Sequence, residues 1–183
     1  MRPGATPIAF MLLSLASPTA GAYCPAANPA ASDIVDHGLL DPSHPIEWRR
    51  HLADALLCSA LAGNAASQEL AGTLYFQGRS RRGNVLPRDI ARARRLLTAA
   101  ANHGRQHAMH RLTQLEIDDG HSYDAALWAR VERELHGPPK PSVDQLHRRA
   151  LADVTRDSRL DTDVWLKLRE IREAMAAENT PRQ

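Results

Sequence analysis

The chain repeats itself with a period of 41 residues. Shifting the sequence by 41 positions places Gly63 on Gly104 and Leu74 on Leu115. A repeat of this length is typical of helical arrays, in which each unit is a supersecondary element that cannot bury its apolar face alone. The sequence therefore contains one complete unit over residues 63–104, preceded by the second half of another unit and followed by a weaker third unit.

Apolar spacing within the complete unit predicts a pair of helices. Small and apolar residues recur every three or four positions in its first half, and Gly78 is expected to end that helix. Gly72 inside it costs about 1 kcal/mol relative to alanine, and we expect this glycine to permit close approach of the neighbouring helix. The second helix is expected to carry Pro87 in its first turn, to bury Leu97 and to end at Gly104.

The composition favours an all-α fold of one domain. Aromatic residues make up only 4% of the 183 residues, although hydrophobic residues reach 43%. The core must therefore consist mainly of leucine and alanine, whereas strands draw on β-branched and aromatic side chains. The length is sufficient for a core that needs no metal or dense disulfide framework.

The complete unit resembles a Sel1-like repeat, a relative of the tetratricopeptide repeat. That family has a Gly-polar-Ala-x-Ala start, a Leu-Gly-x-Leu-Tyr core, Pro-Lys-Asp, and an Ala-Ala-x-x-Gly end. The resemblance implies a short right-handed α-solenoid over residues 48–137 that contacts other proteins, and it does not imply an enzymatic reaction. The matching residues that it assigns to packing are Gly63, Ser67, Gly72, Leu74, Tyr75, Gly78, Pro87, Ala93, Leu97, Ala100, Ala101 and Gly104.

The rest of the C-terminal half departs from the repeat. Thr113 stands where the third unit should have its glycine. Residues 138–141 are proline-rich and predict a stiff spacer. Two helical segments are expected within 142–178, the second of them capping the open end of the solenoid rather than docking on a partner. Residues 179–183 form a tail.

The first 22 residues predict a cleaved signal peptide. Arg2 precedes an apolar run that is too short to cross a bilayer, and a small-x-small pattern ends at Ala22. The residue before Cys24 is Tyr23, which does not fit a lipidation site. We therefore expect an exported protein, most simply in a bacterial periplasm, with no membrane insertion after cleavage. Residues 23–47 lack helical periodicity and are expected to be extended.

Cys24 and Cys58 are the only cysteines. An even number in an exported chain favours a disulfide, with a buried Cys58 and an unpaired Cys24 as the alternative. Alignment to the repeat family places Cys58 at the position of Ala99, at the flank of its helix, where the N-terminal segment could cross it. The expected Cα–Cα separation is then about 4.4–6.8 Å.

Three histidines, His103, His107 and His110, lie close together in the sequence. Zinc accepts imidazole ligands, but no carboxylate has a spacing that supports these three. We interpret them as solvated or partner-facing, and we expect neither a metal nor another cofactor.

A dense cluster of arginines follows the first helix of the complete unit. Its partners could be acidic protein surfaces or anionic envelope polymers, or it could be a solvated helix face partly paired with Asp89. Nucleic acid is not an expected partner, because stacking aromatics are lacking and the formal net charge is only +2. The cluster comprises Arg79, Arg81, Arg82, Arg88, Arg92, Arg94, Arg95 and Arg105.

The sequence lacks the common motifs of hydrolases. It has no GxSxG, SxxK or HExxH motif. The expected function is a non-enzymatic, exported protein-interaction module, such as a periplasmic adaptor or scaffold. The alternatives are a periplasmic immunity or inhibitor protein against a secreted toxin and, with less support, a hydrolase of a cell-envelope polymer, for which no pair of acids stands out. The oligomeric state stays open.

Overall fold

A computed structural model describes residue 24 and residues 29–138, 141–152, 154 and 158–178. The predicted signal peptide and the 179–183 tail lie outside these residues. The described residues form an all-helical structure, as the composition predicts, and contain no strand. The helices are α1 (Ala31–Asp36), α2 (Ile46–Leu61), α3 (Ala65–Gln77), α4 (Ile90–Asn102), α5 (Gln106–Asp118), α6 (Ser122–His136), α7 (Pro141–Ala152) and α8 (Ser158–Glu178), with a short 3-10 helix over Gly78–Ser80.

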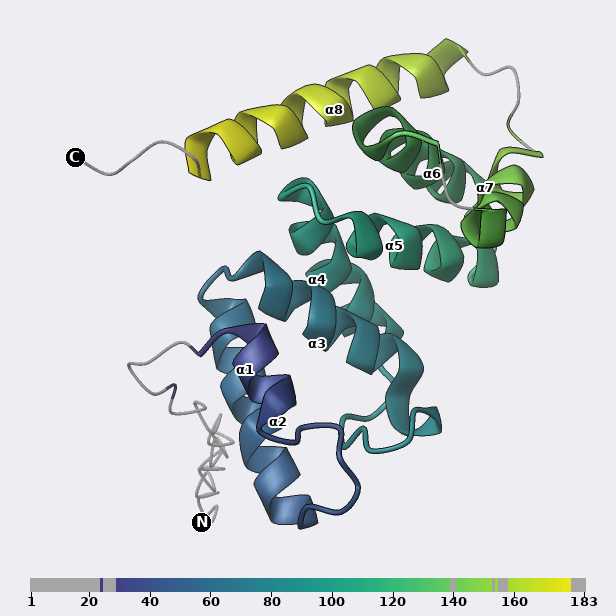
Figure 1. The fold of residues 1–183 in the computed structure, drawn as a ribbon. Helices are drawn as coiled ribbons and strands as arrows, with labels where there is room; N and C mark the ends of the chain where they lie inside the picture. The colour runs from purple at the N-terminus through teal and green to yellow at the C-terminus, as the bar shows by residue number, and fades with distance from the viewer. Residues whose placement is uncertain (1–23, 25–28, 139–140, 153, 155–157, 179–183) are drawn as a thin grey trace, which may run out of the picture.

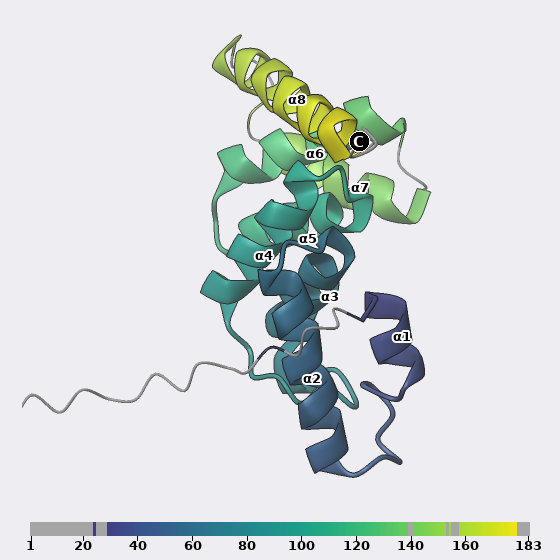
Figure 2. The same ribbon diagram turned by 90° about the vertical axis from the view of Figure 1, so that its left-hand side faces the viewer.

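The helices stack in the order of the sequence (Figure 1). From α2 to α7 each helix packs on the next, and the alternate helices α3, α5 and α7 also contact one another in series. At one end, α1 packs on α2 and α3, while at the other end α8 lies across α6 and reaches α4. The view in Figure 2 shows the same stack from the side, with α1 and α2 far from α8.

The 41-residue period of the sequence recurs in the helix boundaries. Helices α3 and α5 each have 13 residues and begin 41 positions apart, and α2 and α4 end 41 positions apart. Burial follows the same period. The buried residues of α5 are Ala108, Met109, Leu112, Thr113, Leu115 and Glu116, and each aligns with a buried residue of α3.

The two glycines that mark the period have equivalent turns. Gly63 and Gly104 have φ angles of 94° and 76°, in the region that favours glycine. In both turns the next amide donates to a carbonyl five residues earlier, Asn64 to Ser59 at 3.1 Å and Arg105 to Ala100 at 3.2 Å. These bonds satisfy carbonyls at the ends of α2 and α4, as glycine-terminated helices commonly do.

Gly72 brings α3 and α4 into close contact, as predicted. A Cβ atom at this position would lie 2.8 Å from Leu97 Cγ and 3.1 Å from the backbone nitrogen of Leu97.

The predicted start of α4 is wrong by three residues. Pro87 lies before the helix, because Asp89 is the N-cap of α4. The Asp89 side chain accepts a hydrogen bond from the Arg92 amide at 2.9 Å, and the Asp89 amide donates to the carbonyl of Tyr75 at 3.0 Å.

The prediction that residues 23–47 are extended is wrong over α1. This six-residue helix buries Ala31 and Ile34, and Leu39 follows it with only 1% of its surface exposed. Packing on α2 and α3 therefore stabilises a helix that is too short to reveal a 3.6-residue period in its sequence. Trp48 of α2 fixes the connection by donating from Nε1 to the carbonyl of His37 at 3.0 Å.

The disulfide prediction is confirmed. Cys24 and Cys58 are bonded, with Cα atoms 5.3 Å apart, and neither cysteine is free. Cys58 is only 5% exposed, so the alternative was right about its burial and wrong about its pairing. The bond attaches the chain before α1 to the C-terminal turn of α2.

The two C-terminal helices begin earlier than predicted. Pro141, expected to close the spacer, is the first residue of α7, a position that proline favours because its missing amide is not needed there. Helix α8 begins at Ser158 and buries Val164 and Ile171, while Met175 lies against Gly104. The helix thus covers apolar surface at the end of the stack. No described helix combines the length and apolarity that a bilayer crossing requires.

Candidate functional site

An apolar hollow of the surface lies where α2, α3 and α4 meet. It has a volume of about 460 Å³, and Leu61 beside it is 77% exposed. A large aliphatic side chain exposed to this degree next to further apolar groups is typical of a contact surface. The lining residues are Leu57, Ala60, Leu61, Tyr75, Arg92, Arg95 and Leu96, and we call this surface the α2–α4 groove.

Two arginines give the α2–α4 groove a positive charge. Arg92 donates to the Tyr75 hydroxyl at 3.2 Å, lies 5.5 Å from the centre of its ring, and pairs with Asp89 at 3.2 Å. Arg95 is exposed and forms no ion pair with any described residue. The groove therefore offers an apolar surface next to a cation, which suits an apolar side chain followed or preceded by a carboxylate.

A signal for the groove was present in the sequence. The 41-residue shift places Leu57 on Thr98 and Leu61 on Asn102, so α2 carries leucines where the equivalent helix carries polar residues. The equivalent residues Thr98 and Asn102 are polar and half-buried, so leucines at 57 and 61 are a departure from the repeat that favours a contact surface. This signal lies in residues that differ between the units, whereas a repeat is recognised from the residues that match.

Most of the residues predicted to pack the repeat are buried. Gly63 and Pro87 are exposed, Gly104 is half-buried, and the other nine are buried. Ser67 joins α3 to α2 through a 2.8 Å hydrogen bond between its hydroxyl and that of Ser59.

The predicted arginine cluster divides into paired and free side chains. Arg105 pairs with Glu69 at 3.0 Å, and Arg88 reaches the carbonyl of Phe76 at 3.4 Å. Arg81 binds the side chain of Gln77, while Arg79 and Arg82 are exposed. With Arg92 and Arg94 also paired to carboxylates, the cluster is not one continuous anion-binding surface.

Arg94 organises an ionic network between α4, α5 and the start of α6. It donates to both oxygens of the buried Glu116, at 2.8 and 3.1 Å, and to Asp119. His121 lies 2.9 Å from Glu116 on the other side. The hydrogen bond from Arg94 lowers the pKa of Asp119.

Replacing Arg94 with methionine is expected to lower the free energy of unfolding by about 1–3 kcal/mol, because the buried carboxylate of Glu116 loses its bidentate partner. Arg95→Met, on the neighbouring exposed residue, is the matched control and should change stability by less than about 0.5 kcal/mol. Urea unfolding of both variants at pH 7 measures the difference, and equal stabilities would contradict the prediction.

Acid should reduce the difference in stability between the wild type and Arg94→Met. An acid whose pKa is lowered in the folded state stabilises the fold above its ordinary pKa, and this contribution is lost as the pH falls through the lowered value. Because Arg94 lowers the pKa of Asp119, the advantage of the wild type over Arg94→Met should decrease below about pH 4.

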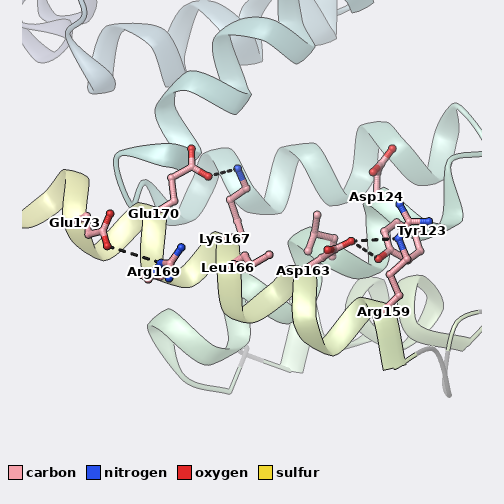
Figure 3. A pocket seen from close by; sticks show the side chains of 10 residues that line it. Tyr123, Asp124, Arg159, Asp163, Leu166, Lys167, Arg169, Glu170 and Glu173 are labelled. Carbon is pink, nitrogen blue, oxygen red and sulfur yellow. Dashed lines mark hydrogen bonds and ion pairs between the residues drawn. The ribbon is translucent and has the colours of Figure 1, made fainter.

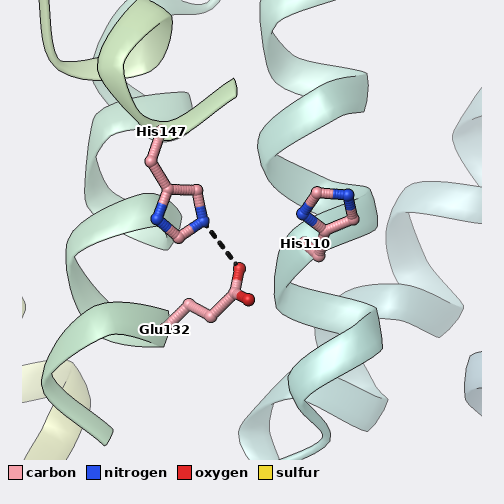
Figure 4. Close-up of side chains that lie close together, drawn as sticks. All are labelled: His110, Glu132 and His147. Atoms are coloured by element: carbon pink, nitrogen blue, oxygen red, sulfur yellow. Dashed lines mark hydrogen bonds and ion pairs between the residues drawn. The ribbon is translucent and has the colours of Figure 1, made fainter. Parts of the chain in front are cut away.

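The three predicted histidines do not converge. His103 lies beside Glu178 at the end of α8, and His107 is exposed. His110 is half-buried and faces two residues that are distant in the sequence, Glu132 of α6 and His147 of α7 (Figure 4). His110 is therefore not fully solvated, because tertiary packing places beside it the carboxylate that its sequence neighbours lack.

The His110–Glu132–His147 cluster is the most buried group of ionisable side chains in the described part of the chain. His147 and Glu132 are 2% and 3% exposed, and His147 Nε2 lies 3.0 Å from Glu132 Oε2. The imidazole rings of His110 and His147 have centres 6.5 Å apart. Burial lowers the pKa of His110, which keeps its imidazole neutral near pH 7.

A wider hollow lies between α6 and α8 (Figure 3) and has a volume of about 670 Å³. Most of its charged groups pair with one another. Asp163 accepts from the Tyr123 hydroxyl at 2.6 Å, and Lys167 pairs with Glu170 at 2.6 Å along α8. Since these contacts neutralise the lining, we regard this hollow as a weaker ligand site than the α2–α4 groove.

No family model, no curated protein and no solved structure matches this chain.

Proposed function

We propose that the protein is an exported, non-enzymatic interaction module built from Sel1-like helix pairs, and that it binds a segment of another protein in the α2–α4 groove. The observation that carries this proposal is the exposed Leu61 in an apolar hollow next to Arg95, a cation without an ion-pair partner among the described residues.

The helix-pair arrangement supports a Sel1-like solenoid. Units offset by 41 residues bury equivalent positions on α3 and α5, and α2 and α4 end in equivalent glycine turns. Stacked helix pairs of this kind form extended surfaces that bind other proteins. The disulfide between Cys24 and Cys58 supports export, because such bonds persist mainly in oxidising compartments.

The chemistry of the groove specifies the partner segment. Leu57, Leu61 and Leu96 would cover an apolar side chain, and Arg95 would pair with a carboxylate close to it. A segment that contains a large apolar residue near Asp or Glu therefore fits better than a basic or wholly polar one. A polyanion without apolar groups would leave the leucines exposed.

Selection of a phage-displayed peptide library on the immobilised protein tests this proposal. Enriched peptides should combine a large apolar residue with an acidic residue, and Leu61→Asp and Arg95→Glu should each abolish their binding. Leu166→Asp, at another exposed leucine on α8, is the matched control and should retain it. A library that yields no enriched sequence, or peptides that bind Leu61→Asp normally, would overturn the proposal.

A further inference from the structure

We propose that His110, Glu132 and His147 form a zinc site between α5, α6 and α7. Each residue offers one donor atom, a ring nitrogen from each histidine and a carboxylate oxygen from Glu132, and these three atoms all lie within 4.8 Å of one another. Figure 4 shows the side chains converging from three different helices. This site is separate from the α2–α4 groove and does not depend on the function proposed there.

A comparison of the two buried glutamates indicates that a cation is needed. Glu116 and Glu132 are both 3% exposed. Glu116 is neutralised by the guanidinium of Arg94, which binds both of its oxygens. Among the described residues, Glu132 contacts no lysine or arginine; its polar partners are His147 and, at 3.4 Å, Gln106. A buried carboxylate without a cation is costly. His147 can supply a cation to Glu132 only when it holds a second proton, whereas a divalent ion would do for Glu132 what Arg94 does for Glu116 with both imidazoles neutral.

The hydrogen bonding of His110 also supports a metal between these three side chains. Its Nδ1 atom is buried and has no hydrogen-bond partner, although buried ring nitrogens in proteins nearly always have one. In Figure 4 a nitrogen of this ring faces Glu132 and His147. A metal bound between the three side chains would give this nitrogen a partner without requiring any new residue.

The donor spacing is compatible with zinc after a small contraction. Zinc bonds of about 2.0–2.2 Å to nitrogen and oxygen in a tetrahedron place neighbouring donors ~3.3 Å apart. His147 Nε2 and Glu132 Oε2 are already 3.0 Å apart, so the main adjustment falls on His110, which is only half-buried.

The donor set selects the class of metal. Two imidazoles and one carboxylate form a recurrent set of three protein ligands for zinc, with the fourth position left to water. Magnesium and calcium prefer sites made only of oxygen. The two cysteines cannot compete for the ion, because both are in the disulfide. A second group, Glu116, His121 and Asp124, also gathers possible ligands, but Arg94 already occupies Glu116.

Calorimetric titration of the purified, disulfide-bonded protein with zinc chloride tests the site. We expect one Zn²⁺ per chain, no binding heat with Mg²⁺, and visible absorption typical of four-coordinate cobalt when Co²⁺ replaces zinc. The melting temperature should rise with zinc concentration, because the ion binds the folded state.

Substitutions locate the ion. His110→Gln and Glu132→Gln should each weaken zinc binding by more than ~100-fold, since loss of a ligand exceeds the usual effect of losing an outer-shell partner. His107→Gln and Glu134→Gln, at exposed residues of the same two helices, are the matched controls and should bind zinc as the wild type does. His110→Gln changes a half-buried residue, and circular dichroism verifies that this variant is folded.

Three results would overturn the proposal. The first is the absence of zinc binding to the wild-type protein. The second is undiminished binding by folded His110→Gln. The third is loss of binding in His121→Gln, which would place the ion at the Glu116–His121–Asp124 group instead.

Discussion

Replacing both cysteines with alanine is expected to lower the free energy of unfolding by about 3–4 kcal/mol. The bond joins residues separated by 34 positions, and without it the unfolded chain gains the freedom of a loop of that length. Urea unfolding of the wild type and of Cys24→Ala/Cys58→Ala measures the difference. Hydrogen exchange should also become faster in α1, because the bond attaches the chain before this helix to α2.

Reductant and a single variant separate the bond from local packing. Cys24→Ala removes the bond but leaves the buried Cys58 side chain in place, so its stability should lie close to that of the double variant. Addition of a thiol reductant should lower the stability of the wild type toward that of Cys24→Ala and leave the variant unchanged. Equal stabilities of oxidised wild type and double variant would show that the bond does not stabilise the fold.

The helix pair could be predicted because its signals are local. Gly72, Gly78 and Gly104 mark a close approach and two helix ends, and apolar spacing defines the buried faces between them. Helix α1 could not be predicted in this way, because six residues cover less than two turns. The burial of Ile34 and Leu39 also depends on α2 and α3, which are distant from them in the sequence. The predicted helix start was wrong where a side chain caps the helix later than expected, as Asp89 does at the start of α4.

The two candidate sites differ in how far the sequence reveals them. The α2–α4 groove could have been found from the leucines at 57 and 61, because the repeat itself supplies the polar reference positions. The His110–Glu132–His147 cluster could not, since its members come from three helices and no spacing rule connects them. Only the packing of α6 and α7 on α5 brings Glu132 and His147 to His110.

Leu97→Ala is expected to lower the free energy of unfolding by about 2–5 kcal/mol, because Leu97 is fully buried between α4 and α3 and its removal leaves a cavity. The same side chain explains why position 72 is glycine. A Cβ atom there would lie 2.8 Å from Leu97 Cγ, so Gly72→Ala should destabilise the wild type although alanine is the better helix former by about 1 kcal/mol.

A double-mutant cycle tests this coupling directly. In the Leu97→Ala protein the side-chain clash is gone and only the 3.1 Å approach to the backbone nitrogen remains, so the cost of Gly72→Ala should shrink by about 1–2 kcal/mol. Leu168→Ala, at a buried leucine of α8 that packs toward α6, provides the control cycle and should add to Gly72→Ala within about 0.5 kcal/mol. Urea unfolding of the single and double variants supplies all the values. If Gly72→Ala costs the same with and without Leu97, the spacing of α3 and α4 is set by contacts other than the one between these two residues.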